Sequence, residues 1–179
     1  FHKTVLKAIK PTLKEENETK KQIKSLLNQI KIKDVKAVLG GSFAKNTWLK
    51  GDSDADIFVQ FDYNKFKDKS DKLSDILEKQ IKHLQPKRLH GSRDYFQIKK
   101  NNLLFEIIPI LNIKKAHDSL NITDISPLHA LWVKKHKMDD EIRLSKAFTK
   151  AQHLYGAESY IQGFSGYVLE ILTIHYGGF

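Results

Sequence analysis

The sequence predicts an α/β fold in which a small mixed sheet with packing helices precedes a purely helical region. Strand-like alternation of apolar and polar residues occurs at residues 35–39, 54–61 and 94–111. Helices with one apolar stripe are predicted over residues 12–30 and 70–84, and no strand pattern follows residue 113. We therefore expect one complete domain and the beginning of a second.

The composition agrees with this size and narrows the class of protein. With 179 residues, 40% of them hydrophobic, the chain can bury one sizeable core and part of another. The lack of cysteine excludes disulfides and thiolate metal sites, and no signal peptide or membrane-spanning run is recognisable, so we expect a soluble, cytoplasmic protein. The formal charge of +10 is compatible with a nucleic-acid partner and equally with simple solubility.

The first 30 residues predict two helices. Pro11 should interrupt a helix over residues 1–10, and Thr12 with Glu15 forms a capping-box pattern for the next one. Lysines on the second helix could contact phosphate or could form an ordinary solvated face.

The segment from Gly40 to Asp56 is the centre of the predicted site. A strand over residues 35–39 ends in Gly40, Gly41 and Ser42, and two glycines permit close backbone approaches that a side chain would block. A helix or tight loop from Ser42 onward would offer free N–H groups to a phosphate, although ordinary turns use the same residues.

Two aspartates stand at alternate positions at the start of the next strand. Asp54 and Asp56 share one strand face, about 6 to 7 Å apart, while the face from Ala55 to Phe61 is apolar and should face the core. Two neighbouring carboxylates favour a divalent cation, and the alternative is a solvated strand end.

A third carboxylate lies in the predicted hairpin over residues 94–111. Glu106 interrupts the apolar return strand LLFEIIPIL after a turn at residues 100–102. Burying it is costly unless it is paired or metal-bound, and the alternative is an edge strand, which Pro109 would suit.

The C-terminal third predicts three helices. Ser126 and Pro127 predict a helix with serine as its cap and His129 in its first turn, where the histidine could donate to a phosphate or lie on the surface. A second helix opens at residues 139–141, and a third, strongly apolar one covers residues 165–176 and should pack against more protein.

Taken together, the motifs resemble a known family. The glycine–serine turn with two acidic residues on the next strand and one on a later strand resembles the DNA polymerase β type of nucleotidyltransferase. The segments GGSFAKNTWLKGDSDADIF, FEIIPI, SPLHALW, DDEIRLSKAFTKAQHLYGAE and GFSGYVLEILTIHYGGF resemble, in this order, the archaeal class of CCA-adding enzyme.

The resemblance implies a catalytic head at residues 1–115 and a helical central domain, incomplete, at residues 116–179, with body and tail domains absent. It implies transfer of CMP and AMP from CTP and ATP to the 3′ end of tRNA, with two Mg²⁺ ions. The implied catalytic, metal-binding residues are Asp54, Asp56 and Glu106. The implied nucleotide-binding residues are Gly41, Ser42, Lys45, Ser126, His129, Lys146 and Tyr155.

The chain departs from the family pattern in three respects. Archaeal members more often carry glutamate, aspartate and aspartate at the carboxylate positions, and arginine in place of Lys45. Lysine would give a point charge where arginine gives a bidentate phosphate contact. Members also continue well past residue 179, so we interpret the chain as a fragment; a dimer is one state open to the full-length enzyme.

Two alternatives to this function remain open. One is another nucleotidyltransferase of the same fold, such as a poly(A) polymerase or an enzyme that modifies a small molecule. The other is a non-catalytic RNA-binding module, which would have no need for three converging carboxylates.

Overall fold

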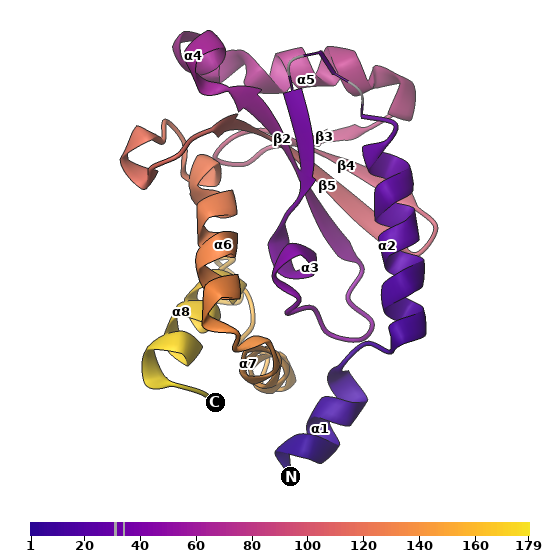
Figure 1. Cartoon of the computed structure of the whole chain (residues 1–179), viewed down its shortest axis with the longest axis vertical. Helices are drawn as coiled ribbons and strands as arrows, with labels where there is room; N and C mark the ends of the chain where they lie inside the picture. The colour runs from indigo at the N-terminus through magenta and orange to yellow at the C-terminus, as the bar shows by residue number, and fades with distance from the viewer. Residues whose placement is uncertain (31, 34) are drawn as a thin grey trace.

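A computed structural model describes residues 1–30, 32–33 and 35–179 of the chain (Figure 1). The helices are α1 (His2–Ile9), α2 (Leu13–Leu27), α3 (Gly41–Lys45), α4 (Tyr63–Phe66), α5 (Leu73–Ile81), α6 (Ser126–His136), α7 (Asp139–Ala151) and α8 (Gly166–Tyr176). The strands are β1 (Val35–Leu39), β2 (Asp54–Asp62), β3 (Lys87–Leu89), β4 (Tyr95–Lys100) and β5 (Leu103–Asn112). Short 3₁₀ segments are η1 (Lys67–Lys72), η2 (Lys82–Leu84), η3 (Ala116–Asp118) and η4 (Ile122–Ile125).

The five strands form one mixed sheet, which confirms the predicted fold class. Their order is β1-β2-β5-β4-β3, with β2 and β5 parallel and every other pair antiparallel. In the parallel pair Asp56 is the direct partner of Glu106, and Asp54 is the partner of Leu104. The register therefore places two of the predicted carboxylates side by side.

The main core lies on the sheet face that the alternation predicts. The side chains of Ala55, Ile57, Val59 and Phe61 are fully buried, and apolar residues of α2 and α5 pack over them. The opposite face carries a smaller cluster of Phe58, Ile108 and Ile110. Both faces of β2 thus carry buried apolar residues beyond Asp56, which fixes the strand that carries the aspartates.

Most predicted elements are confirmed, with small differences at their ends. The capping box of Thr12 and Glu15 begins α2, and the hairpin of β4 and β5 turns at residues 101–102. The helix predicted over residues 70–84 is regular only as α5, with 3₁₀ segments on both sides. The edge strand β3 is too short to show a periodic pattern in the sequence.

The prediction that Ser126 caps α6 is wrong. The cap position is Ile125, and Ser126 is the first helical residue without a side-chain capping bond. The reason is the preceding segment η4, which Asn121 and Asp124 cap instead and which continues directly into α6. His129 still falls in the first turn of the helix.

Helix α6 contacts α3 and α8, while α7 and α8 bond to the loop that follows α3; Figure 1 shows the three helices beside α3. Arg143 of α7 is fully buried, and its guanidinium donates to Trp48 O at 3.1 Å, to Asn46 Oδ1 at 3.1 Å and to Asp140 Oδ1 at 2.6 Å. These polar contacts place Arg143 against the loop after α3, while Phe148 on the same helix is exposed.

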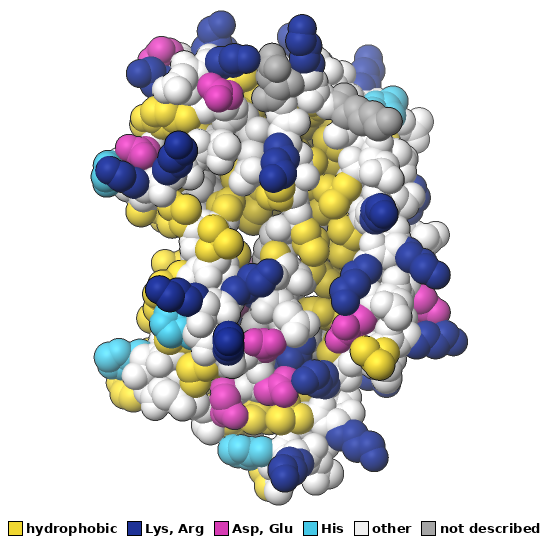
Figure 2. All heavy atoms as spheres, viewed as in Figure 1, with side chains coloured by type: hydrophobic (Ala, Val, Ile, Leu, Met, Phe, Trp, Pro, Cys, Tyr) yellow, Lys and Arg dark blue, Asp and Glu magenta, His cyan; other side chains and the backbone are white. Residues whose placement is uncertain are grey.

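The positive charge is not gathered in one place on the face shown in Figure 2. Lysine and arginine side chains are spread over this view and alternate with acidic and apolar ones. Among the described residues, no helix combines the length and apolar character needed to cross a membrane.

Candidate active site

The turn between β1 and α3 packs directly on β2. A Cβ atom built on Gly40 would lie 2.2 Å from the Phe58 ring, and one built on Gly41 would lie 1.6 Å from Asp56 Oδ2. Gly41 also has a φ of +53°, which L side chains rarely adopt. The prediction that both glycines permit close approaches is confirmed, and the second one brings the backbone against a carboxylate.

The three predicted carboxylates occupy the beginnings of β2 and β5. Asp56 lies between Asp54, two residues earlier on its own strand, and Glu106, its partner on β5. Burial, followed by repulsion from Glu106, raises the pKa of Asp56 to about 6. A cation beside these groups would remove the repulsion, so the donor set fits a divalent metal.

These carboxylates do not form a finished ligand set. In the described part of the chain, no three histidine, aspartate or glutamate side chains are grouped closely enough to hold one ion. Gln97 of β4 donates a 2.8 Å hydrogen bond to Glu106 Oε1 and so engages one of the carboxylate oxygens.

A cavity of about 240 Å³ opens beside the turn, between α3, the start of β2 and helices α7 and α8. Seven predicted site residues line it: Gly41, Ser42, Lys45, Asp54, Asp56, Lys146 and Tyr155. Four residues that the sequence did not single out complete the charged and aromatic lining: Asp52, Lys150, Tyr167 and Glu170. Glu106 lies next to Asp56 in the sheet, and Ser126 is not among the residues that line this cavity.

Glu170 of α8 joins the basic residues of the site. Its carboxylate is fully buried and accepts from Lys45 Nζ at 2.8 Å, and it lies 2.7 Å from His129 Nε2. Lys146 Nζ lies 3.6 Å from the other carboxylate oxygen. His129 is therefore buried and bonded to Glu170, and is not a surface histidine.

A second ion pair lies among the residues that line the cavity. Lys150 Nζ lies 2.6 Å from Asp52 Oδ1 and 5.1 Å from the centre of the Tyr155 ring. Burial raises the pKa of Tyr155 to about 12, which keeps its hydroxyl protonated. The cavity lining thus combines three lysines with the carboxylates of Asp52, Asp54, Asp56 and Glu170.

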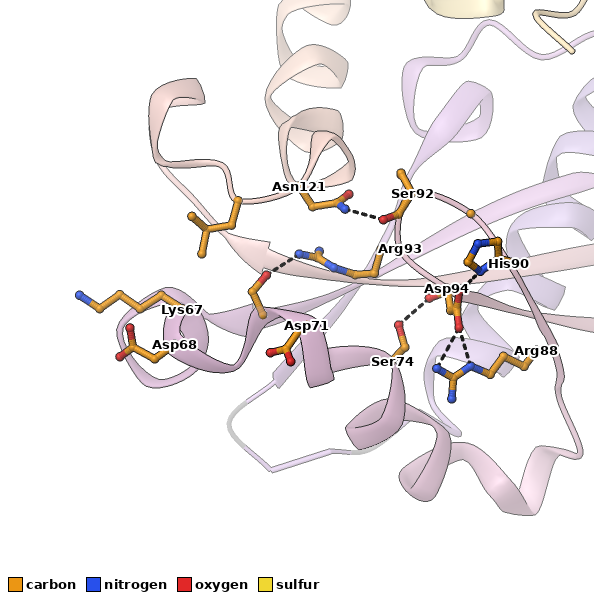
Figure 3. Close-up of a pocket in the computed structure, with 13 residues that line it drawn as sticks. Lys67, Asp68, Asp71, Ser74, Arg88, His90, Ser92, Arg93, Asp94 and Asn121 are labelled. Atoms are coloured by element: carbon orange, nitrogen blue, oxygen red, sulfur yellow. Dashed lines mark hydrogen bonds and ion pairs between the residues drawn. The ribbon is translucent and has the colours of Figure 1, made fainter. Parts of the chain in front are cut away.

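A larger pocket of about 560 Å³ lies elsewhere, around Arg88 and Arg93 (Figure 3). The Arg93 guanidinium pairs with Asp124 and donates to Ser70 and to the Pro109 carbonyl. Arg88 pairs with Asp75, Glu78 and Asp94. Because carboxylates already satisfy both guanidinium groups, we assign this pocket a structural role.

Comparison with known sequence families agrees with this geometry. The family described as "Nucleotidyltransferase domain" matches residues 17–117, and the family described as "tRNA nucleotidyltransferase, second domain" matches residues 140–179. The chain belongs to the nucleotidyltransferase domain family.

Individual curated relatives of the chain are archaeal enzymes. The CCA-adding enzyme of Nanoarchaeum equitans is 46% identical over 79% of this chain and 36% of its own length. That of Sulfurisphaera tokodaii is 36% identical over 98% of this chain and 43% of its own length. The chain thus spans roughly two fifths of these relatives, and the predicted resemblance is confirmed.

Solved structures confirm the fold. The RNA terminal uridylyl transferase Cid1 superposes with a TM-score of 0.73 at 18% identity, over 98% of this chain and 51% of its own. A cytoplasmic RNA terminal U-transferase gives a TM-score of 0.64 at 18% identity, over 98% of this chain and 52% of its own.

The contact between Gly41 and Asp56 can be tested with a matched pair of alanine substitutions. Gly51 also has a positive φ, of +88°, but a Cβ there would meet nothing within 4 Å. We expect Gly51→Ala to lower the free energy of unfolding by about 1 kcal/mol, from backbone strain alone. Gly41→Ala should cost about 2 to 4 kcal/mol, because the new methyl group also displaces the carboxylate.

Urea unfolding followed by circular dichroism measures both changes. An equal decrease in the free energy of unfolding for the two variants would contradict the close packing of the turn on Asp56.

Proposed function

We propose that the chain is the nucleotide-transferring part of a CCA-adding enzyme, which transfers CMP and AMP from CTP and ATP to the 3′ end of tRNA without a template. The observation that carries this proposal is the cavity in which the glycine–serine turn, two strand aspartates and Lys146 meet. Sequence similarity to archaeal CCA-adding enzymes over up to 98% of the chain supports the choice of tRNA as substrate.

The triphosphate would lie between the turn and α7. Lys45 and Lys146 bring ammonium groups to the cavity, and Ser42 lines the same wall with its hydroxyl. Tyr155, protonated through its raised pKa, lines the same cavity and can also donate to a phosphate. Together these groups would orient the α-phosphate toward β2, where the acidic residues lie.

Asp54, Asp56 and Glu106 would hold two Mg²⁺ ions. When bound, the ions would lower the pKa of the RNA 3′-hydroxyl and stabilise negative charge on the leaving pyrophosphate. The raised pKa of Asp56 supports this assignment, since a group held among like charges gains most from a cation.

The proposal is tested by incubating purified protein with Mg²⁺, labelled CTP and ATP, and tRNA that lacks its CCA end. We expect addition of C, C and A to the tRNA, and a loss of more than about 100-fold in Asp54→Asn and Asp56→Asn. Asp62→Asn is the matched control, because Asp62 lies on the same strand, at its far end, and caps α4.

Three results would contradict the proposal. Incorporation that survives both substitutions would remove the metal assignment, and equal labelling of random RNA would remove tRNA as the substrate. Equal incorporation of UTP and GTP would indicate a different nucleotidyltransferase.

The proposed phosphate contact of Lys146 predicts a pH dependence. Burial lowers the pKa of Lys146 from 10.5 to about 8, although Glu170 opposes the change. Phosphate binding requires the charged ammonium, so affinity for ATP should be full below pH 8. Above pH 8 it should fall by up to about tenfold per pH unit as the group loses its proton.

Isothermal titration calorimetry with ATP and Mg²⁺ between pH 6.5 and 9.5 measures this affinity. Lys146→Arg should remove the dependence, since guanidinium stays charged throughout this range. An identical pH profile in that variant would show that another group titrates.

A further inference from the structure

Glu170 is the one acidic residue of the otherwise apolar helix α8, and it is fully buried. Its partners come from four separate parts of the chain. They are Lys45 of α3, Thr47 of the following loop, His129 of α6 and Lys146 of α7, at distances of 2.8, 3.5, 2.7 and 3.6 Å. One carboxylate of α8 therefore joins α3, the loop after it, α6 and α7.

The arrangement keeps Glu170 ionised despite its burial. Burial alone would raise the pKa of Glu170, but the bond to His129 and the charges of Lys45 and Lys146 outweigh it and lower the pKa. Lys146 also needs this negative charge, because burial and the charge of Lys45 lower the pKa of Lys146 while Glu170 raises it.

A direct structural contact fixes the position of Lys146. Its ammonium donates to Thr47 Oγ1 at 3.1 Å and to Thr47 O at 3.3 Å, and only 3% of the residue is exposed. These neutral acceptors orient the group, and Glu170 is the nearest negative charge. Other charged groups that act on Lys146 are Lys45, Asp52 from the loop before β2, and Asp56 of β2.

We propose that Glu170 is a positioning residue of the nucleotide site, which holds the ammonium groups of Lys45 and Lys146 side by side, charged and directed at the triphosphate. It touches neither the substrate nor the reacting atoms in this role. The inference rests on the proposed function for its nucleotide, but the effect on the lysines is a property of the protein alone.

The test is Glu170→Gln, which keeps the shape of the side chain and removes its charge. With Glu170 uncharged, the titration midpoint of Lys146 should fall by about one pH unit below its wild-type value, measured from the ¹³Cε shift of that lysine. Affinity for ATP at pH 8 should fall about fivefold with it, because the charged fraction of Lys146 drops from about one half to about one tenth. The control is Glu78→Gln, which removes a carboxylate from the distant Arg88 ion pairs and should leave both quantities unchanged.

Glu170→Asp provides a second variant that retains the charge and withdraws it by one methylene. In Glu170→Asp we expect the titration midpoint of Lys146 and the affinity for ATP to lie between those of wild type and Glu170→Gln. If Glu170→Gln does not fold, the same measurements on Glu170→Asp test the proposal. A folded variant of either kind with an unchanged Lys146 midpoint would overturn the proposal, because a purely structural anchor would alter stability alone.

The result separates this inference from the proposed function. If the protein fails to bind ATP or extend tRNA but the Lys146 midpoint shifts, the proposed function fails and the electrostatic role of Glu170 stands. If ATP binding and tRNA extension are present and the pH profile of Glu170→Gln matches wild type, the inference fails and the function stands.

Discussion

The contact between the Gly41 backbone and the Asp56 carboxylate is the constraint from which the rest of the site follows. It leaves no room for a side chain on the turn, and it sets the beginning of α3 against the acidic end of β2. Any anion bound by the turn would thus lie next to the carboxylates. The parallel pairing of β2 with β5 then adds Glu106 beside Asp56, through a register that the buried core fixes.

Polar groups join helices α7 and α8 to this centre. Arg143, Lys146 and Glu170 are all buried, and each bonds to the segment between Lys45 and Trp48. Burying such charges is costly unless they are paired, and here each has a partner of opposite charge or a carbonyl oxygen. Through this pairing Lys45, Lys146 and Glu170 line one cavity together with the aspartates at the start of β2.

Much of the fold could be predicted from the sequence, because its elements have strong local signals. Alternation identified β2 and the hairpin of β4 and β5, and the capping box of Thr12 and Glu15 identified α2. The cap of α6 could not be predicted, since the decisive residues belong to the preceding 3₁₀ segment. The three-residue strand β3 is too short to show alternation of apolar and polar residues, and it is defined by its pairing with β4.

The residues of the site also divide into those that the sequence predicts and those that it does not. Residues of the turn and of β2 were found because their spacing has direct meaning, whereas Glu170, Lys150 and Asp52 reach the cavity only through tertiary packing. One signal was available for Glu170, a single charge within an apolar helix, which is unfavourable unless it is paired. The partners of that charge, on three other elements and one loop, cannot be identified from helical periodicity.

The central claim is that the triphosphate binds in the cavity between the turn and α7, beside the strand carboxylates. A crystal structure of the protein with Mg²⁺ and a non-hydrolysable CTP analogue tests it most directly. We expect phosphate oxygens within hydrogen-bond distance of Ser42, Lys45 and Lys146, and metal density at Asp54 and Asp56. Nucleotide bound instead in the pocket around Arg88 and Arg93 would contradict it.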